Sequence, residues 1–301
     1  MPLALLAVLL PTLFWDRPVE TAGTLRKAGI ARLYVPAGRE QAWRKRGFTA
    51  VPFDRARSVQ AVAPSVEYRM DVASATRVPW LNANGWRFER EPARAFFYDV
   101  PAGSAALAAA EAFAYGVEAA IRAAPEDLPP MAAMLTFLHG IDQARLPVMA
   151  NIGVIDDGSD SMAEALNLMA RHNLLFHVIP AAGAKYDLTI RKVPTDTDPY
   201  EFAMQVRRDL TDEKRLVRVY GSNVVLARLT GDGTQVRLHL LNYGKAVVRG
   251  LRVRVLGGYQ HGRLSAFGHP GGALEDYNVQ DGATEFTVLE LGAYAVVDLT
   301  R

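Results

Sequence analysis

The stretch Asn151-Ile-Gly-Val-Ile-Asp-Asp-Gly-Ser159 decides the fold class of this chain of 301 residues. It begins as a short apolar strand and ends in a turn that carries two aspartates. Residues 161–171 follow with the periodicity of a helix, and residues 174–179 are again apolar. A strand, a helix and a strand in this order form a βαβ unit, which predicts parallel α/β packing.

The same alternation of helices and strands extends on both sides of this unit. Before it, the patterns predict helices over 21–28, 39–46, 104–123 and 130–138, and strands over 31–36, 48–53 and 96–100. After it, they predict a helix over 199–210 and a strand over 216–220. Residues 55–95 are rich in loops, and a stretch of this length in a compact domain is unusual unless it is functional.

The pattern changes near residue 224, where the helical period disappears. In 235–240, for example, Val236, Leu238 and Leu240 alternate with polar residues, which is typical of a strand with one buried face. Turns rich in Gly and Asp separate such strands and indicate hairpins. We therefore expect an α/β domain over 15–223, mainly a parallel sheet with flanking helices, followed by an antiparallel β-sandwich over 224–301.

The first 14 residues have two interpretations. The apolar run Leu3–Phe14 is too short to span a bilayer and has the length of the apolar region of a signal peptide. Alternatively, it is a buried first strand that ends at Trp15-Asp16. We favour the remnant of a signal peptide over 1–14. This interpretation predicts a secreted or periplasmic protein with no membrane span after processing.

Composition excludes several classes of function. The chain has no cysteine, so disulfides, thiolate metal sites and cysteine nucleophiles are excluded. The six histidines show no H-x-x-x-H spacing, so we expect no metal site. The nucleotide-binding and serine-hydrolase motifs are missing, and we expect no cofactor. With 34 basic and 32 acidic residues, nothing indicates binding to nucleic acid.

A segment with the composition of a sugar-binding surface lies within 77–90. Aromatic rings cover the apolar face of a sugar, while amide and guanidinium groups satisfy its hydroxyls. The candidate contacts are Trp80, Asn82, Asn84, Trp86 and Arg87. The alternative is a structured loop whose tryptophan rings pack against the domain.

Two carboxylates are candidates for catalysis. Asp99 ends a predicted strand, where it can be catalytic, bind sugar hydroxyls or cap the next helix. Glu111 is the only charged residue in the run 103–117, so desolvation would suit it to act as a general acid. Its alternative is a hydrogen-bonded carboxylate on a helix. Tyr115 lies one helical turn further along the same stripe and is a candidate ligand contact.

Asp156 and Asp157 follow the strand of the βαβ unit and form a second acidic candidate. Paired carboxylates can bind a cation, share a proton or contact substrate. The alternative is structural, because Ser161 and Glu164 have the spacing of a capping box and acidic residues favour a helix N-terminus.

The last 150 residues resemble the rear half of certain bacterial glycoside hydrolases. In those enzymes a catalytic barrel is followed by an α/β domain like that of glutamine amidotransferases and then by a small β-sandwich. The resemblance rests on the segments 151–159, 215–222 and 238–243. The resemblance implies that the amidotransferase-like part is non-catalytic and serves oligomerisation, so we expect a homo-oligomer. About 150 residues precede this part, fewer than the roughly 250 of a full barrel.

Together these patterns predict a secreted or periplasmic carbohydrate-active protein related to glycoside hydrolases, with a glycan bound in the α/β domain. If it is an enzyme, Asp99 and Glu111 are the expected pair of catalytic carboxylates. The alternative is a non-catalytic module for carbohydrate binding or oligomerisation that acts beside an enzyme.

Overall fold

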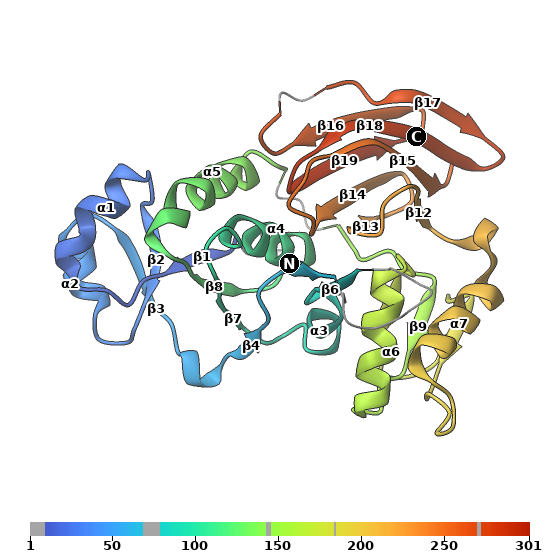
Figure 1. The fold of residues 1–301 in the computed structure, drawn as a ribbon, viewed down its shortest axis with the longest axis horizontal. Coiled ribbons are helices and arrows are strands. Elements are labelled where there is room, and N and C mark those ends of the chain that lie inside the picture. Colours follow the sequence, from blue (N-terminus) through green and yellow to red (C-terminus); the bar gives the residue numbers. More distant parts are fainter. Residues whose placement is uncertain (1–9, 69–78, 143–145, 184, 270–271) are drawn as a thin grey trace, which may run out of the picture. The chain divides into compact units, whose positions relative to one another are not determined.

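The computed structural model describes residues 10–68, 79–142, 146–183, 185–269 and 272–301. The chain forms an α/β region with a parallel sheet, followed by an antiparallel β-sandwich, as the sequence predicts (Figure 1). It divides into two compact units. The first consists of Met1–Ser65, Asn82–Asn84 and Glu91–Arg145, and the second of Val66–Leu81, Gly85–Arg90 and Leu146–Arg301.

The first unit is built on a six-stranded parallel sheet with the order β3-β2-β1-β8-β7-β4. Its strands are β1 (Thr12–Phe14), β2 (Arg32–Val35), β3 (Thr49–Pro52), β4 (Val59–Ala61), β7 (Phe96–Asp99) and β8 (Ala119–Arg122). Strands β1, β2 and β3 are adjacent in that order, and so are β4, β7 and β8. The last strand of the sheet, β8, pairs with the first, β1. This is the cyclic order of a β/α barrel, interrupted between β3 and β4.

The sheet curls strongly, as its side chains show. Phe14, Tyr34, Phe53, Phe97 and Ala120 form one buried cluster. The rings of Phe53, just after β3, and Phe97, on β7, have centroids 6.3 Å apart. In a flat sheet these strands, four positions apart, would be separated by about 19 Å. The cluster therefore fills the concave side of a sheet that is rolled part of the way toward a barrel.

Helices flank this sheet, and one of them is shorter than the sequence predicts. They are α1 (Ala22–Lys27), α2 (Glu40–Lys45), α4 (Ala105–Tyr115) and α5 (Leu128–His139), with short 3-10 turns η1 (Val19–Thr21), η2 (Arg55–Arg57) and η3 (Pro125–Asp127). The expected helix over 104–123 is wrong in its second half. It ends at Gly116, whose φ of 63° is the left-handed conformation that favours glycine at a helix end, and β8 follows.

The N-terminal apolar run contributes a strand to the sheet. Thr12–Phe14 form β1, which pairs in parallel with β2 on one side and β8 on the other. These three residues are all buried. For them the structure corresponds to the interpretation as a buried first strand. Residues 1–9 of the run lie outside the described residues.

The second unit contains the βαβ arrangement predicted from residues 151–179. Strand β9 (Ile152–Val154), helix α6 (Asp160–Arg171) and strand β10 (Phe176–Val178) follow in order, and β9 and β10 are parallel. A third parallel strand, β11 (Leu188–Ile190), pairs with β9 and was not predicted from the sequence. Helix α7 (Pro199–Lys214) follows it and packs with α6.

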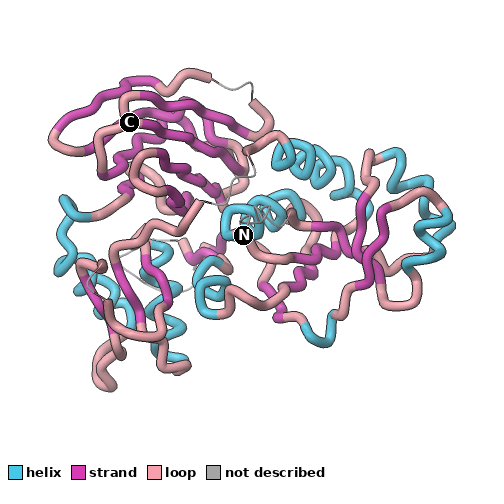
Figure 2. The backbone as a smooth tube through the Cα atoms, turned by 180° about the vertical axis from the view of Figure 1, so that it is seen from behind, coloured by secondary structure: helices cyan, strands magenta, loops and turns pink. Residues whose placement is uncertain are grey.

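The β-sandwich completes the second unit (Figure 2). One sheet has the order β12-β15-β18-β17, with β12 (Val217–Val219), β15 (Val248–Leu256), β17 (Glu275–Gln280) and β18 (Ala283–Leu291). The other has the order β13-β14-β19-β16, with β13 (Val225–Gly231), β14 (Gln235–Asn242), β16 (His261–Ala266) and β19 (Tyr294–Thr300). Alternate residues such as Leu238, Val253, Phe286 and Val297 form the core between the sheets. The strand expected over 216–220 is β12, which is part of the sandwich.

The stretch expected to be rich in loops contains more regular structure than the sequence indicates. Strands β5 (Ser65–Glu67) and β6 (Trp80–Asn82) form a two-stranded sheet, and Gly85–Arg90 form the helix α3. Arg77 and Val78, at the start of the sugar-binding candidate segment, lie outside the described residues. In the described part of the chain, no helix combines the length and apolar character needed to cross a membrane.

Candidate functional site

Three charged side chains meet at the carboxyl ends of neighbouring strands in the first unit. Asp99 ends β7 and is in register with Arg122, which ends β8, and Asp16 lies two residues after β1. Arg122 Nη1 contacts Asp99 Oδ2 at 3.3 Å, and Arg122 Nε contacts Asp16 Oδ2 at 3.5 Å. All three side chains are between 36% and 47% exposed. The carboxyl ends of parallel strands are where ligands bind in α/β proteins.

Further groups surround this cluster, which we call the Asp16–Arg122–Asp99 site. Arg39, beyond β2, donates a hydrogen bond of 2.7 Å to the backbone oxygen of Asp16. The guanidinium of Arg55, beyond β3, lies 4.4 Å from the centre of the Phe97 ring. Exposed ion pairs contribute only about 0–1 kcal/mol, so hydrogen bonds to a ligand can replace them at little cost. The site thus offers both acceptors and donors to a polar ligand.

Glu111 occupies a different environment, because its side chain is completely buried. Its carboxylate accepts hydrogen bonds from the Asn84 backbone N–H (2.7 Å), from Asn84 Nδ2 (2.8 Å) and from the Tyr98 hydroxyl (2.7 Å). Asn84 in turn bonds the backbone N–H and C=O of Val62. Burial and the neighbouring Glu111 charge raise the pKa of Tyr98 well above its usual value. Glu111 therefore joins α4, β7 and the segment around Asn84.

The structure does not bring Asp99 and Glu111 together as a facing pair. Tyr98 and Asp99 are successive residues of β7, so their side chains point to opposite faces of the sheet. Since Tyr98 reaches Glu111, Asp99 lies on the other face, with Arg122. Tyr115, the last residue of α4, is half-buried. Glu118 lies beyond the helix and accepts a hydrogen bond of 2.9 Å from Tyr34.

The sugar-binding candidates around Trp80 are divided between the two units. Asn82 and Asn84 belong to the first unit, and Asn82 donates a hydrogen bond of 2.9 Å to the Ser65 hydroxyl. Trp80, Trp86 and Arg87 belong to the second unit.

Each tryptophan of this segment carries an arginine on a ring face. The Arg171 guanidinium lies 4.2 Å from the Trp80 ring centre, and that of Arg87 lies 4.2 Å from the Trp86 ring centre. Trp86 also packs against the apolar cluster around β9 and α6. Cation–π contacts of this kind stabilise the local structure and cover one face of each ring.

The two aspartates after β9 have separate partners. Asp156 forms a bidentate ion pair with Arg90, at 2.6 and 3.0 Å. Asp157 accepts a hydrogen bond of 2.9 Å from the Ser159 backbone N–H, and bonds from Ser159 lower the pKa of this carboxyl. The N-cap of α6 is Ser159, whose hydroxyl accepts from Met162 N, so the capping box expected from Ser161 is wrong. Ser159 has the extended backbone that an N-cap requires.

Sequence reasoning missed Asp16 and Arg122 as members of a site. The helical pattern over 104–123 includes Arg122, and Asp16 enters the sequence prediction only as the end of the alternative first strand. The available signal was an aspartate at the end of an apolar run, which is a pattern of strand carboxyl ends. Within the described ranges, no group of three or more His, Asp or Glu side chains is arranged to hold a metal ion.

Comparison with known proteins gives a likeness of fold. No protein-family model matches the sequence, and no curated protein matches it. Among solved structures, the alpha-L-fucosidase isoenzyme 2 from Paenibacillus thiaminolyticus is similar over 71% of this chain, with 8% identity and a TM-score of 0.54. The chain spans 62% of that fucosidase.

Two further similar structures are also glycoside hydrolases. The beta-galactosidase from Rahnella sp. R3 matches 65% of this chain and 51% of its own, with 10% identity and a TM-score of 0.39. A GH42 beta-galactosidase from G. stearothermophilus matches 79% of this chain and 53% of its own, with 8% identity and a TM-score of 0.40. These structural neighbours are thus glycoside hydrolases at low identity, and of the three the fucosidase comparison supports an argument about the fold.

Proposed function

We propose that this chain is a carbohydrate-active protein that binds a glycan in its α/β part, at the Asp16–Arg122–Asp99 site. The observation that carries the proposal is the meeting of two exposed carboxylates and a guanidinium at the carboxyl ends of three adjacent strands. A sugar hydroxyl both donates and accepts hydrogen bonds, so it complements carboxylate and guanidinium side by side. The likeness of fold to a fucosidase supports the same ligand class.

The site also offers a candidate pair of catalytic carboxylates. Hydrolysis of a glycosidic bond needs two carboxyl groups about 5–5.5 Å apart for retention or about 6.5–9.5 Å apart for inversion. Asp16 and Asp99 contact the same guanidinium, which keeps their carboxylates close to this range. In this proposal Asp99 keeps its expected role, and Asp16 takes the place of Glu111 as its partner.

The second candidate function is a non-catalytic module for carbohydrate binding or oligomerisation. The observation in its favour is the complete burial of Glu111, on the sheet face opposite Asp99. An amidotransferase-like role for the α/β part of the second unit belongs to this alternative.

A binding experiment with matched variants tests the proposal. Wild type, Asp99→Asn and Glu91→Gln are compared on a glycan array, and hits are measured by calorimetry. Glu91 is the control because it is 43% exposed and paired with an arginine, as Asp99 is, but lies away from the strand ends. We expect at least a tenfold loss of affinity for Asp99→Asn alone. Equal binding by all three proteins would refute the site.

Hydrolysis of aryl glycosides separates the two candidate functions. Activity in the wild type that is lost in both Asp16→Asn and Asp99→Asn supports catalysis by this pair. Binding without hydrolysis supports the non-catalytic module.

Asn84 is 0% exposed and bonded to Glu111, so it has a structural role. The remaining expected contacts are proposed for each unit by itself: Asn82 and Tyr115 in the first, and Trp80, Trp86, Arg87, Asp156 and Asp157 in the second. Their arginine and backbone partners give each of the tryptophans and aspartates a structural role as well. Trp86→Ala in the same array tests the contacts of the second unit, and unchanged binding would remove Trp86 from the proposal. Secretion or export to the periplasm is proposed too, and fractionation of the producing cells tests it.

A further inference from the structure

Two arginines lie directly opposite each other on the outer face of the β-sandwich. Arg218 on β12 is in register with Arg254 on β15, while Val217, Val253 and Val255 point into the core. Side chains directly opposite in an antiparallel pair have Cβ atoms about 4.5–5.5 Å apart, and like charges there are destabilising. An anion bound between the two arginines would therefore be favourable.

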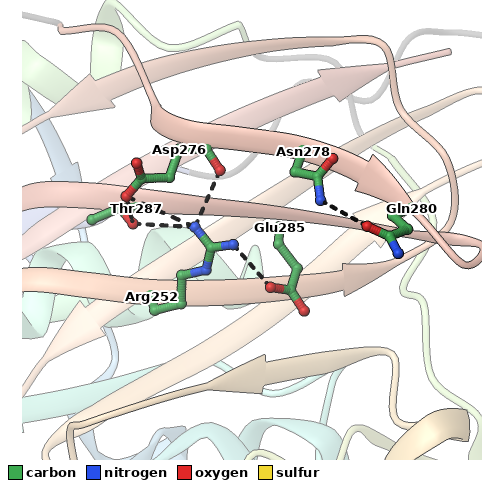
Figure 3. Close-up of polar contacts among 6 residues, drawn as sticks. All are labelled: Arg252, Asp276, Asn278, Gln280, Glu285 and Thr287. Atoms are coloured by element: carbon green, nitrogen blue, oxygen red, sulfur yellow. Dashed lines mark hydrogen bonds and ion pairs between the residues drawn. The ribbon is translucent and has the colours of Figure 1, made fainter.

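The carboxylate nearest in register to Arg254 is committed elsewhere. Glu285 on β18 lies opposite Arg254, but its Oε2 accepts a hydrogen bond of 2.9 Å from Arg252 (Figure 3). Arg252 also donates to the Asp276 backbone oxygen and to the Thr287 hydroxyl. Arg252 is thus paired on this face, and the hydrogen bond of Glu285 goes to Arg252 and not to Arg254.

Arg254 itself has no such partner. It forms no ion pair with any residue in the described ranges, and its Nη1 is buried without a hydrogen-bond acceptor there. A buried donor that lacks an acceptor is destabilising, and more so when it is charged. Because the side chain as a whole is only half-buried, it remains accessible from the outer face of the sheet.

The charge of Arg218 is only partly offset, because its carboxylate partner is shared. Asp212, near the end of α7, contacts Arg207 at 3.6 Å, Arg215 at 3.2 Å and Arg218 at 3.5 Å. The neighbouring Glu213 is exposed, and a hydrogen bond with Thr211, together with the charge of Arg218, lowers the pKa of its carboxyl. The Asp212 carboxylate thus contacts three guanidinium groups.

The environments of Arg215 and His172 are in line with this excess of positive charge. Arg215 is 7% exposed, and its Nε is buried with no acceptor among the described residues. Burial, together with the charges of Arg171, Arg207 and Arg215, lowers the pKa of His172 to about 4.

We propose that Arg218 and Arg254, with Arg207 and Arg215, form a binding site for an oxyanion, either a carboxylate or a sulfate or phosphate group. The planar guanidinium fork matches such groups in a bidentate manner. This inference goes beyond the proposed glycan site and does not rest on it. The oxyanion belongs to an acidic saccharide or is a free inorganic ion, and the experiment distinguishes these sources.

The test measures binding of sodium sulfate to the whole protein by calorimetry and by thermal shift, with sodium chloride at matched ionic strength as the reference. We expect sulfate to raise the melting temperature of the wild type more than chloride does. Arg254→Gln and Arg218→Gln should each lower the sulfate affinity at least tenfold. Arg249→Gln is the matched control, because Arg249 lies on the same strand β15 but is 78% exposed and paired with Glu290.

A second readout separates a binding site from a merely structural arginine. At low ionic strength without sulfate, Arg254→Gln should melt at a higher temperature than the wild type, because it removes the repulsion from Arg218. A structural role for Arg254 predicts a lower melting temperature instead. Sulfate and chloride having equal effects on the wild type, or unchanged sulfate binding by Arg254→Gln, would overturn the proposal. Glucuronate and glucose 6-sulfate, compared with glucose, then identify the source of the oxyanion.

Discussion

Replacing Glu111 by alanine tests whether this carboxylate holds the first unit together. The substitution removes the acceptor of three buried hydrogen bonds, two from Asn84 and one from Tyr98. Glu111 is 0% exposed, so these donors lie away from bulk solvent. The variant also leaves a cavity between α4 and β7.

The size of the effect follows from these lost bonds. Each buried donor left without an acceptor costs about 1–3 kcal/mol, and partial relaxation of the network reduces the sum. We expect a total loss of about 3–5 kcal/mol, which is in the range for breaking a buried polar network. For a unit of this size the melting temperature should fall by about 10 °C or more. Glu111→Gln keeps one oxygen as acceptor, so it should lose about half as much.

Differential scanning calorimetry of the full chain measures this change as a shift of one transition. Glu20→Ala is the control, because Glu20 is exposed in the same unit and should change stability by less than about 0.5 kcal/mol. A melting temperature for Glu111→Ala within about 2 °C of the wild type would refute the reasoning. Glycan binding by Glu111→Gln, measured well below its melting temperature, should equal that of the wild type if the residue is structural.

Three further predictions concern the second unit. Glu89 is buried between Arg228 and His177. Burial raises the pKa of Glu89, but these two partners lower it further, to below 4.5. The ionised Glu89 therefore stabilises the fold above that pH, and this contribution is lost in acid. Glu89→Gln should lower the free energy of unfolding by about 3–5 kcal/mol in urea titrations at pH 7, and a loss under 1 kcal/mol would contradict this. Burial and nearby arginines hold the pKa of His239 well below 6.5, so below pH 6.5 the unfolded chain binds a proton that the folded chain does not. As the pH is lowered below 6.5, the free energy of unfolding should therefore fall by up to about 1.4 kcal/mol per pH unit. In His239→Gln it should fall less steeply with pH than in the wild type. Ser159→Ala removes the N-cap of α6 and should cost about 1 kcal/mol, whereas an unchanged urea midpoint would mean that the cap is not needed.

Local patterns predict the regular elements of this chain well, because they depend on neighbours in sequence. The βαβ unit and the alternation in the sandwich are of this kind. Helix α4 shows where such reasoning fails. Alanine suits a helix, yet Ala119 and Ala120 lie in β8 because Gly116 ends the helix and the small Ala120 fits beside Phe97 in the concave cluster. Only the tertiary structure supplies that neighbour.

The candidate site could be predicted only in part, for the same reason. Asp99 was recognised from the end of its own strand. Arg122 becomes its partner through the pairing of β7 with β8. Asp16 joins them through the pairing of β8 with β1, which lies about 100 residues earlier in the sequence. The burial of Glu111 likewise depends on Asn84, which is 27 residues away.

The curled sheet itself explains why a ligand is expected at one end of the strands and not within the sheet. Phe14, Tyr34, Phe53 and Phe97 fill the concave side, and all are at most 6% exposed. Deeper on the same side, the Tyr34 hydroxyl is bonded to Glu118, and burial, with the charge of Glu118, raises the Tyr34 pKa to about 12, so this polar pair is already satisfied. Asp16, Arg122 and Asp99 lie on this side beyond the aromatic layer, at the carboxyl ends, where their side chains stay accessible. A substitution that opens the layer, such as Phe97→Ala, should thus destabilise the unit by about 3–5 kcal/mol while leaving the charges of the site in place.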